Sequence, residues 1–314
     1  MQLRTNDTRL ARSRAQAPDA WRGWGLRSAG TAFLAIAATV AALAGAAEAE
    51  PAASVTVCGP AEPGSQEGAS GLGAAWTDTG ALLLADGRRF MPEGIALPSR
   101  LASDAALPSA AERAARTTLD TCLVRPGAGR MDRHGRLSAV GWLACPARNG
   151  AAEEDLATAL LRAGAGYAQP TAQDNGCLAP RLAAETEART ARRGIWAEPS
   201  AVAPAVNEDA MAIRSGLFTV AEGRVLAAGG TRDRIFINFG SSWRQDFTAM
   251  MEREDFATIM GDSLEPAMLR GTMVRVRGVV RAEGGPAIML RRPGEIALLA
   301  GAQAPVTRAR RGGE

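Results

Sequence analysis

Two tight-turn motifs, each next to short apolar runs, constrain the fold of this chain more than any other feature. In the stretch 80–97, GALLLADGRRFMPEGIAL, the Asp86-Gly87 pair separates two apolar runs, which predicts a β-hairpin. In the stretch 129–145, GRMDRHGRLSAVGWLAC, a charged turn precedes an alternating apolar strand. Another strand is expected near Cys122, so this second turn is predicted to form the tip of a hairpin.

Three helical patterns accompany these strands. Ser109, with Glu112 three residues later, predicts a helix that begins with a capping box. A second pattern ends at Gly164, a residue type that commonly closes helices. A third has Pro180 near its start and Gly194 after its end, as expected for helix termini.

The first fifty residues have the pattern of a secretory signal peptide. Residues 1–28 are polar and rich in arginine, and the stretch 29–47 is uncharged and apolar. An A-x-A pattern follows, which predicts cleavage after Ala49. The alternative is an uncleaved N-terminal membrane anchor, because about 19 apolar residues can just span a bilayer. We expect a periplasmic or secreted protein that has no membrane span once residues 1–49 are removed.

The exported part of the chain is predicted to be electrically neutral, although the whole chain is basic. All 36 basic residues are arginine, and the net charge is +3. Residues 1–49 alone carry this surplus, with six arginines against three acidic residues. Affinity for nucleic acid comes largely from neutralised phosphates, so a dedicated binder usually has a basic excess. The charge balance therefore predicts weak nucleic-acid binding at most.

The chain has four cysteines, Cys58, Cys122, Cys145 and Cys177. An even number in an exported chain predicts two disulfides. No C-x-x-C pair occurs, which argues against a zinc or redox motif. Four cysteines allow three pairings, and the count alone leaves all three open.

Composition divides the remaining chain into segments. Residues 50–71 are rich in glycine, alanine, proline and glutamate, and predict an irregular lead-in with one strand. The stretch 197–211 contains prolines and has no periodic pattern, which predicts an interdomain linker. Residues 212–300 contain several strand patterns and one short helix, and predict a second, smaller β domain. The tail, 301–314, is expected to be disordered.

Four stretches, taken in order, resemble the thermonuclease, or staphylococcal nuclease-like, family. They match its first hairpin, its Asp-x-Tyr-Gly-Arg strand opening, a helix ending in Leu-x-x-x-Gly-x-Ala, and a final helix closed by Gly-x-Trp. The stretches are LADGRRFMPEGIALP, DRHGRLSAVGWL, DLATALLRAGAGYAQP and LAAETEARTARRGIW. The resemblance covers residues 72–196 and implies a β-rich α+β fold, a five-stranded OB-type barrel with three helices.

The resemblance also implies a site. The family cleaves phosphodiesters with a Ca²⁺ ion held by carboxylates, a glutamate that activates water and two arginines that stabilise charge on the phosphate. Gly80 and Ala96 stand where the family has metal-binding aspartates. Met91 replaces the first arginine and Ser99 the glutamate, so Arg136 is the only catalytic residue retained. Loss of even one such group typically lowers the rate roughly 10²–10³-fold.

Other polar residues could act in a rearranged site. Asp78 keeps the first acid of the family's Asp-Gly-Asp-Thr strand, but not the position of the missing ligand. Glu93, Arg100 and Asp104 lie nearby in the sequence. Such a site would need several of these groups at once, so we expect no metal cofactor, and Ca²⁺ only if the site is rearranged.

His134, the only histidine of the chain, replaces the tyrosine of the family's turn motif. One interpretation is that it contacts a phosphate or base beside Arg136, which makes these two residues the candidate substrate-binding pair. The other is that its ring packs half-exposed on the hairpin. As a sole histidine it has no histidine partner for a metal site.

The resemblance also implies a disulfide pairing. On this fold, Cys122 begins the strand before the charged turn and Cys145 ends the strand after it. A Cys122–Cys145 bridge would then join neighbouring strands. Cys58–Cys177 would tie the lead-in to the segment before the last helix.

Residues 212–300 more loosely resemble an OB-like β module that follows thermonuclease domains in some exported bacterial proteins. Alternation over 273–280 predicts that two valines point inward and two arginines outward. Several aromatic residues are expected to form either a base-stacking platform beside arginines or an ordinary core. The valines are Val274 and Val276, the aromatic residues are Phe236, Phe239, Trp243 and Phe247, and the arginines are Arg232, Arg234, Arg275 and Arg277.

These patterns predict an exported, catalytically degenerate thermonuclease-like protein that binds or scaffolds an envelope protein or ligand. One alternative is a Ca²⁺-dependent nuclease with a rearranged active site. Another is a nucleic-acid-binding protein without catalysis.

Overall fold

The computed structural model describes residues 58, 71–77, 80–98, 104–145, 153–172, 176–242 and 245–299. The predicted signal peptide, the predicted tail and most of the lead-in lie outside these residues. So do Asp78, Ser99, Arg100 and Trp243. The described residues form a β-rich α+β fold.

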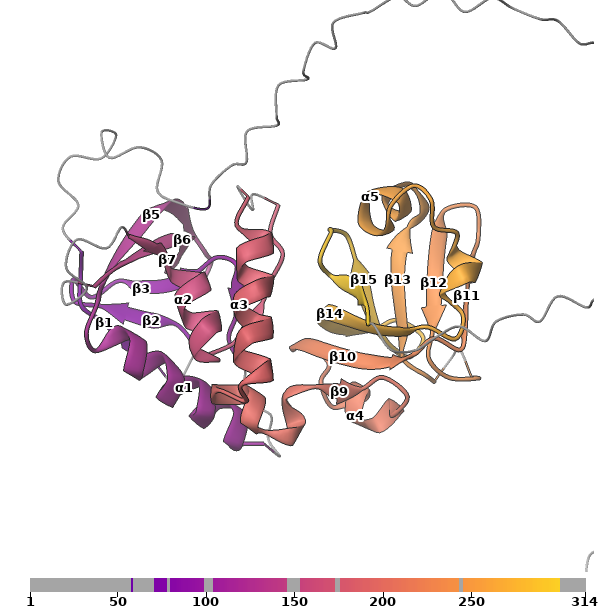
Figure 1. Ribbon diagram of the computed structural model, residues 1–314, viewed down its shortest axis with the longest axis horizontal. Coiled ribbons are helices and arrows are strands. Elements are labelled where there is room, and N and C mark those ends of the chain that lie inside the picture. The colour runs from indigo at the N-terminus through magenta and orange to yellow at the C-terminus, as the bar shows by residue number, and fades with distance from the viewer. Residues whose placement is uncertain are drawn as a thin grey trace, which may run out of the picture. The chain divides into compact units, whose positions relative to one another are not determined.

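The first sheet contains both predicted hairpins (Figure 1). Its strands, in spatial order, are β1 (Ala74–Trp76), β2 (Leu82–Leu84), β3 (Arg89–Pro92), β6 (Arg136–Ala144) and β5 (Leu123–Met131), and β7 (Glu154–Asp155) also pairs with β6. The β2–β3 and β5–β6 pairs are antiparallel, which confirms the two hairpins. β3 and β6 run parallel and join the hairpins into one sheet.

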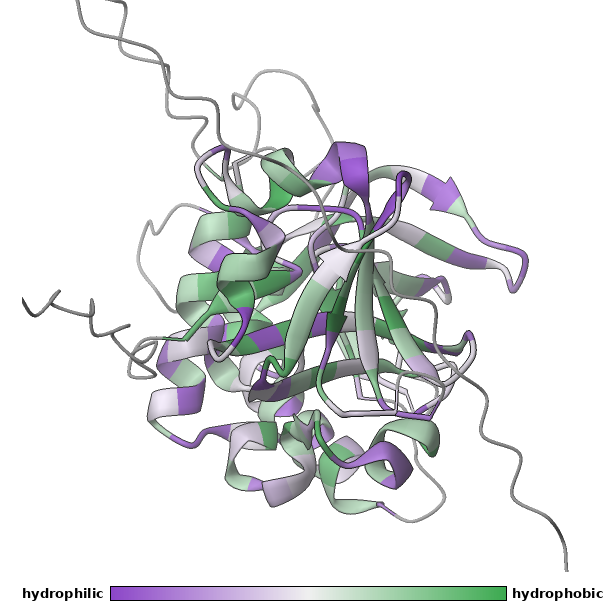
Figure 2. Ribbon diagram, turned by 90° about the vertical axis from the view of Figure 1, so that its right-hand side faces the viewer, coloured by the Kyte–Doolittle hydropathy of each residue, from purple (hydrophilic) through white to green (hydrophobic). Residues whose placement is uncertain are grey.

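Three helices accompany this sheet: α1 (Ala106–Leu119), α2 (Leu156–Ala163) and α3 (Leu178–Thr190). Every second residue of β6 is buried, and these side chains join residues of α1, α2 and α3 in one apolar cluster. Hydrophobic residues accordingly concentrate on strands and inner helix faces (Figure 2). Gly164 closes α2 with φ of 80°, as predicted.

The predicted start of α1 is wrong. The helix begins at Ala106, where Asp104 Oδ1 accepts hydrogen bonds from the backbone N–H groups of Ala106 and Leu107. Ser109 lies inside the first turns, and its hydroxyl donates to Ala105 O. Glu112 pairs with Arg116 on the exposed face. An aspartate before a helix can accept hydrogen bonds from its free N–H groups as well as a serine can. The sequence pattern alone could not show which of Asp104 and Ser109 lies at the helix start.

The segment predicted as an interdomain linker contains short regular elements. After 3₁₀ helices at Gly194–Ala197 and Pro199–Ala201 come β9 (Ala203–Pro204) and α4 (Glu208–Ala212). β9 pairs in parallel with β10 (Phe218–Arg224), and Ala201, Ala203 and Met211 are fully or almost fully buried. These elements are too short to show a helical or strand periodicity of hydrophobic residues, so they could not be predicted from the sequence pattern.

The second sheet has the strands that the sequence predicts and three that it did not. The described strands are β9, β10, β11 (Ala227–Gly230), β12 (Arg234–Asn238), β13 (Thr248–Glu252), β14 (Met273–Ala282), β15 (Pro286–Leu290) and β16 (Ile296–Leu298). β9, β13 and β16 were not predicted. Short helices lie at Arg253–Asp255, α5 (Phe256–Met260) and Pro266–Leu269.

The second sheet is strongly curled into a half-barrel. β14 bends within this sheet and pairs with different strands along its two parts. Residues 273–279 of β14 pair with β10, whereas 280–282 pair with β15. The change of partner follows Gly278, where a Cβ atom would lie only 2.6 Å from Ile288 Cγ2. β10 and β14 consequently run across β12 and β13 (Figure 1). A separate two-stranded pair joins β4 (Ile95–Ala96) to β8 (Tyr167–Ala168).

Both predicted disulfides are present. Cys58 is bonded to Cys177, and Cys122 is bonded to Cys145. Two disulfides indicate a protein that folds in an oxidising milieu outside the cytosol. Among the described helices, none has the length and apolar character needed to cross a bilayer.

Candidate functional site

The two polar turns of the first sheet lie at the same end of the sheet. β3 and β6 are parallel, Arg89 is in register with Arg136, and each strand begins directly after its turn. The turns are therefore neighbours although about 45 residues separate them. A hydrogen bond joins them, from Arg89 Nη2 to His134 O at 2.9 Å.

Asp132 organises the β5–β6 turn. Its Oδ1 accepts from the backbone N–H groups of His134 (2.8 Å) and Arg136 (2.9 Å), and its Oδ2 accepts from Arg136 Nε (2.7 Å). Gly135 supplies the positive φ that the turn requires. The hydrogen bonds from Arg136 and His134 lower the pKa of Asp132 to about 2, so the carboxylate is ionised at neutral pH.

Arg136, which the resemblance places at a catalytic position, is therefore part of the turn itself. The guanidinium of Arg136 is half-buried and is paired with Asp132. The His134 side chain is exposed, and its Nε2 accepts a hydrogen bond from Arg133 Nε at 3.1 Å. The structure thus brings His134 and Arg136 together in one turn, where both are engaged with their neighbours.

The positions at which the resemblance places metal ligands are occupied by residues adapted to other roles. Gly80 has φ of 71°, a left-handed conformation that favours glycine. A Cβ atom at Gly80 would lie 3.7 Å from Leu97 Cβ, so position 80 is close to the residue after Ala96. Ala96 is 8% exposed and pairs with Tyr167 in the β4–β8 ladder. A carboxylate there would lose most of its hydration, which is costly without a paired cation.

The nearby acids that could substitute serve other contacts. Glu93 Oε1 accepts from Ser138 Oγ at 3.2 Å, and Ser138 is in register with Met91. Asp104 caps α1. These nearby acids thus supply two half-buried carboxylates, Glu93 and Asp104, and each already accepts hydrogen bonds, whereas Ca²⁺ takes about 6–8 oxygen ligands. They do not fit a calcium ion.

One other group of potential metal ligands occurs among the described residues, and it is chemically occupied. Cys58, Cys177 and Asp155 offer atoms within 4.8 Å of one another. Both sulfur atoms belong to a disulfide, and Asp155 accepts hydrogen bonds from Thr158 and Arg181. A metal requires thiolates and a free carboxylate, so this group is structural.

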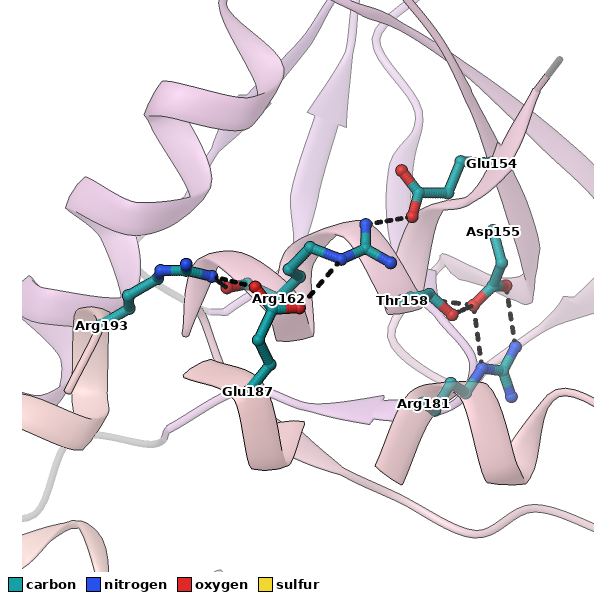
Figure 3. Close-up of polar contacts among 7 residues, drawn as sticks. All are labelled: Glu154, Asp155, Thr158, Arg162, Arg181, Glu187 and Arg193. Atoms are coloured by element: carbon teal, nitrogen blue, oxygen red, sulfur yellow. Dashed lines mark hydrogen bonds and ion pairs between the residues drawn. The ribbon is translucent and has the colours of Figure 1, made fainter. Parts of the chain in front are cut away.

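The most deeply buried charges were missed by sequence reasoning (Figure 3). Arg181 of α3 is 1% exposed and donates to Asp155 from Nε (3.0 Å) and Nη2 (2.9 Å). Asp155 is also the N-cap of α2, since its Oδ2 accepts from Thr158 N at 2.8 Å. The guanidinium fills the space over Gly94, where a Cβ atom would lie 2.2 Å from Arg181 Cζ. One ion pair thus fixes α2, α3 and the β3–β4 turn.

A second buried pair corrects the prediction for Arg277. This arginine points away from the core valines of β14 but is 3% exposed, not solvated. Its Nη1 and Nη2 donate to Glu185 Oε2 (2.7 Å) and Oε1 (3.0 Å), and Nη1 also donates to Ala168 O (2.9 Å). Leu178, Leu182, Glu185 and Arg189 share helical spacing along α3, but spacing alone could not identify a partner more than 90 residues away. Arg275, half-buried, pairs with Glu222.

Of the two interpretations of the aromatic residues, the ordinary core is the one observed at two positions. Phe239 and Phe247 are buried core residues whose rings stack on each other at 5.2 Å. Phe236 is half-buried on the opposite face of the sheet, because it alternates with the buried Ile235 and Ile237. The ordinary-core interpretation therefore holds for Phe239 and Phe247, and Phe236 remains as an accessible ring.

Comparison with known proteins does not assign this chain to a family. No family model matches the sequence, and no curated protein matches it. The solved structures that match include an aspartyl-tRNA synthetase from Entamoeba histolytica, which is 14% identical with a TM-score of 0.24. The match covers 32% of this chain and 22% of the synthetase chain, so it spans about a fifth of that protein's length.

Proposed function

We propose that this chain is an exported, thermonuclease-like protein that has lost phosphodiesterase chemistry and serves as a binding or scaffolding module of the cell envelope. In this proposal the first sheet with α1, α2 and α3 is an OB-type barrel, and the curled second sheet is an OB-like module. The hairpin order, the three helices and the curl support it.

One observation carries the proposal. The two positions that would present metal ligands, Gly80 and Ala96, have no side-chain oxygen; Gly80 has a left-handed backbone conformation, and Ala96 is buried. Arg136 persists because it completes the Asp132 turn, a role that needs no substrate. Without a general base, no group activates the attacking water. Without a metal, arginine is the only cation that could stabilise the charge on the phosphate.

Export is part of the proposal. The two disulfides agree with an oxidising compartment, and the A-x-A pattern at Ala49 gives the expected cleavage point. N-terminal sequencing of the protein recovered from the periplasm or medium tests it. We expect a chain that begins at Glu50, whereas an intact N-terminus in the membrane fraction would indicate the anchored alternative.

A calcium-dependent DNA digestion assay tests the loss of chemistry. We expect no cleavage above the level of a chelator-treated control. Calcium-dependent cleavage that disappears in an Arg136→Ala variant would establish the rearranged nuclease instead. Arg133→Ala, in the same turn but at a position without a catalytic counterpart, is the matched control: cleavage equal in all three proteins would identify a contaminating nuclease.

A second candidate, nucleic-acid binding without catalysis, is favoured by the charge of the two turns. Five arginines gather there against Asp86 and Asp132, namely Arg88, Arg89, Arg130, Arg133 and Arg136. A site that neutralises about three phosphates loses affinity with a log–log salt slope of roughly −2 to −3. Fluorescence anisotropy with a labelled duplex at several salt concentrations measures this slope, and a slope near zero would exclude the candidate.

A further inference from the structure

A groove lies over β11, β12 and β13, on the face opposite the core of the second sheet. Its volume is about 510 Å³, within the ~300–1,000 Å³ typical of small-molecule sites. Two cross-strand rows form its floor, because residues at alternate positions of a strand share a face. Gly229, Phe236 and Met250 make one row, and Asn238 and Thr248 belong to the other.

The apolar row leaves room for a flat ring. Gly229 lies in register with Phe236, and a Cβ atom built on Gly229 meets no other atom within 4 Å. The half-buried Phe236 therefore lies beside open space instead of a neighbouring side chain. Met250, 5% exposed, adds a polarisable sulfur next to this ring. An aromatic group can stack or pack edge-on against Phe236 from this side.

The polar row and the rim set the charge of the ligand. Thr248 Oγ1 donates to Asn238 Oδ1 at 3.0 Å, which fixes the amide so that its N–H donors remain available. Among the described residues that line the groove, Glu283 alone is ionisable. It lies exposed in the β14–β15 turn, and no ion pair is seen for it within the described chain. The groove is therefore apolar with one negative charge at its edge.

We propose that this groove binds an organic cation, an aromatic body that carries an ammonium group. The ring would lie against Phe236 and Met250, and the ammonium would face Glu283. A phosphate-bearing ligand is disfavoured, because its charge would repel Glu283. The inference goes beyond the proposed function and does not depend on the loss of nuclease chemistry, since the groove lies on the second sheet.

A charge series of one ring tests the proposal. The probes are tryptamine, tryptophol and indole-3-propionate, which are cationic, neutral and anionic at neutral pH. Binding to the exported chain is followed by NMR of ¹³C-methyl methionine, with the Met250 signal assigned from a Met250→Leu variant. We expect tryptamine to shift this signal at the lowest concentration, and the propionate to bind weakest. Equal affinities for the three probes, or no shift of the Met250 signal, would overturn the proposal.

Two variants locate the binding. Gly229→Leu places a side chain in the open groove and is expected to weaken tryptamine binding more than tenfold. Gly73→Leu is its matched control, at an exposed glycine directly before β1 whose Cβ would lie 4.0 Å from Ala85 Cβ. Glu283→Gln removes the rim charge without touching the core, and should reduce the preference for tryptamine over tryptophol about three- to fivefold. An unchanged preference in Glu283→Gln would overturn the proposal even if Gly229→Leu failed to fold.

Discussion

Two aspartate–arginine pairs in this molecule have similar hydrogen bonds and opposite settings. In the β5–β6 turn, Asp132 binds two backbone N–H groups and Arg136, four residues away, at the surface. At the start of α2, Asp155 binds a backbone N–H, a hydroxyl and Arg181, 26 residues away, with both side chains 2% exposed. The first pair is visible in the sequence as a motif, and the second is not.

The comparison teaches that a sequence motif need not mark a functional site. Asp132 and Arg136 hold a turn that the hairpin requires, so their presence is explained without catalysis. Asp155 and Arg181 hold two helices and a loop together in the protein interior. Exposed pairs contribute about 0–1 kcal/mol, whereas breaking a buried pair costs about 3–5 kcal/mol. The stability of the fold should therefore depend on the buried pair.

The largest effect is expected from Asp155→Ala. The substitution leaves Arg181 buried without its carboxylate and removes the N-cap of α2, which together cost about 4–6 kcal/mol. Urea unfolding measures the change in the free energy of unfolding. Glu154→Gln is the matched control, since the neighbouring Glu154 pairs with Arg162 near the surface and should matter by less than about 1 kcal/mol. Equal losses in the two variants would contradict the comparison.

The second buried pair extends the test. Arg277→Met leaves Glu185 without its bidentate partner and should destabilise the protein by about 3–5 kcal/mol. The double variant Arg277→Met/Glu185→Met should recover most of this loss, because an apolar pair of similar size is often as stable as a buried ion pair. If the double variant is less stable than Arg277→Met alone, this prediction is wrong. The ion pair would then stabilise the fold by more than the desolvation of its two charges costs.

The Cys122–Cys145 disulfide should have a smaller effect. Its cysteines are 23 residues apart, and loss of the bridge costs about 3 kcal/mol through the entropy of the unfolded chain. The Cys122→Ser/Cys145→Ser variant measures this by thermal unfolding. The Cys58–Cys177 bridge closes 119 residues, so its removal should cost more on the same account. The reverse order would show that chain entropy does not dominate here.

The smallest effect is expected at the surface turn and is best seen as a pH dependence. Hydrogen bonds from Arg136 and His134 lower the pKa of Asp132 to about 2 in the folded chain, below its ordinary value of 3.8. A depressed folded pKa gives stability that is present above the unfolded value and is lost as pH falls through the folded one. The Asp132→Asn variant should therefore converge with the native chain between about pH 4 and pH 2. A constant difference between the two proteins over that window would contradict this assignment.

Local patterns predicted much of the fold. The hairpins at Asp86-Gly87 and 132–136 and the end of α2 at Gly164 each depend on residues close in sequence, and each is confirmed. The start of α1 was missed because both Asp104 and Ser109 are residue types that can accept hydrogen bonds at a helix N-terminus. β9 and α4 were missed because they are too short to show a periodic pattern.

Long-range features were beyond the sequence patterns. The partners of Arg181 and Arg277 lie 26 and 92 residues away, and nothing in the spacing of α3 indicates them. The groove could not be predicted either, because it depends on the register that places Gly229 beside Phe236. The expected losses at Gly80 and Ala96 followed from the family resemblance, which stays a hypothesis about this chain.

A calcium titration of the purified protein, followed by calorimetry in the presence of a short DNA oligonucleotide, tests the central claim most directly. If the first sheet keeps the turn but has no ligands for the ion, the titration will give no saturable heat beyond that of the oligonucleotide alone. Saturable binding of one calcium ion per chain, lost in the Glu93→Gln variant, would contradict the account and restore the active-site interpretation.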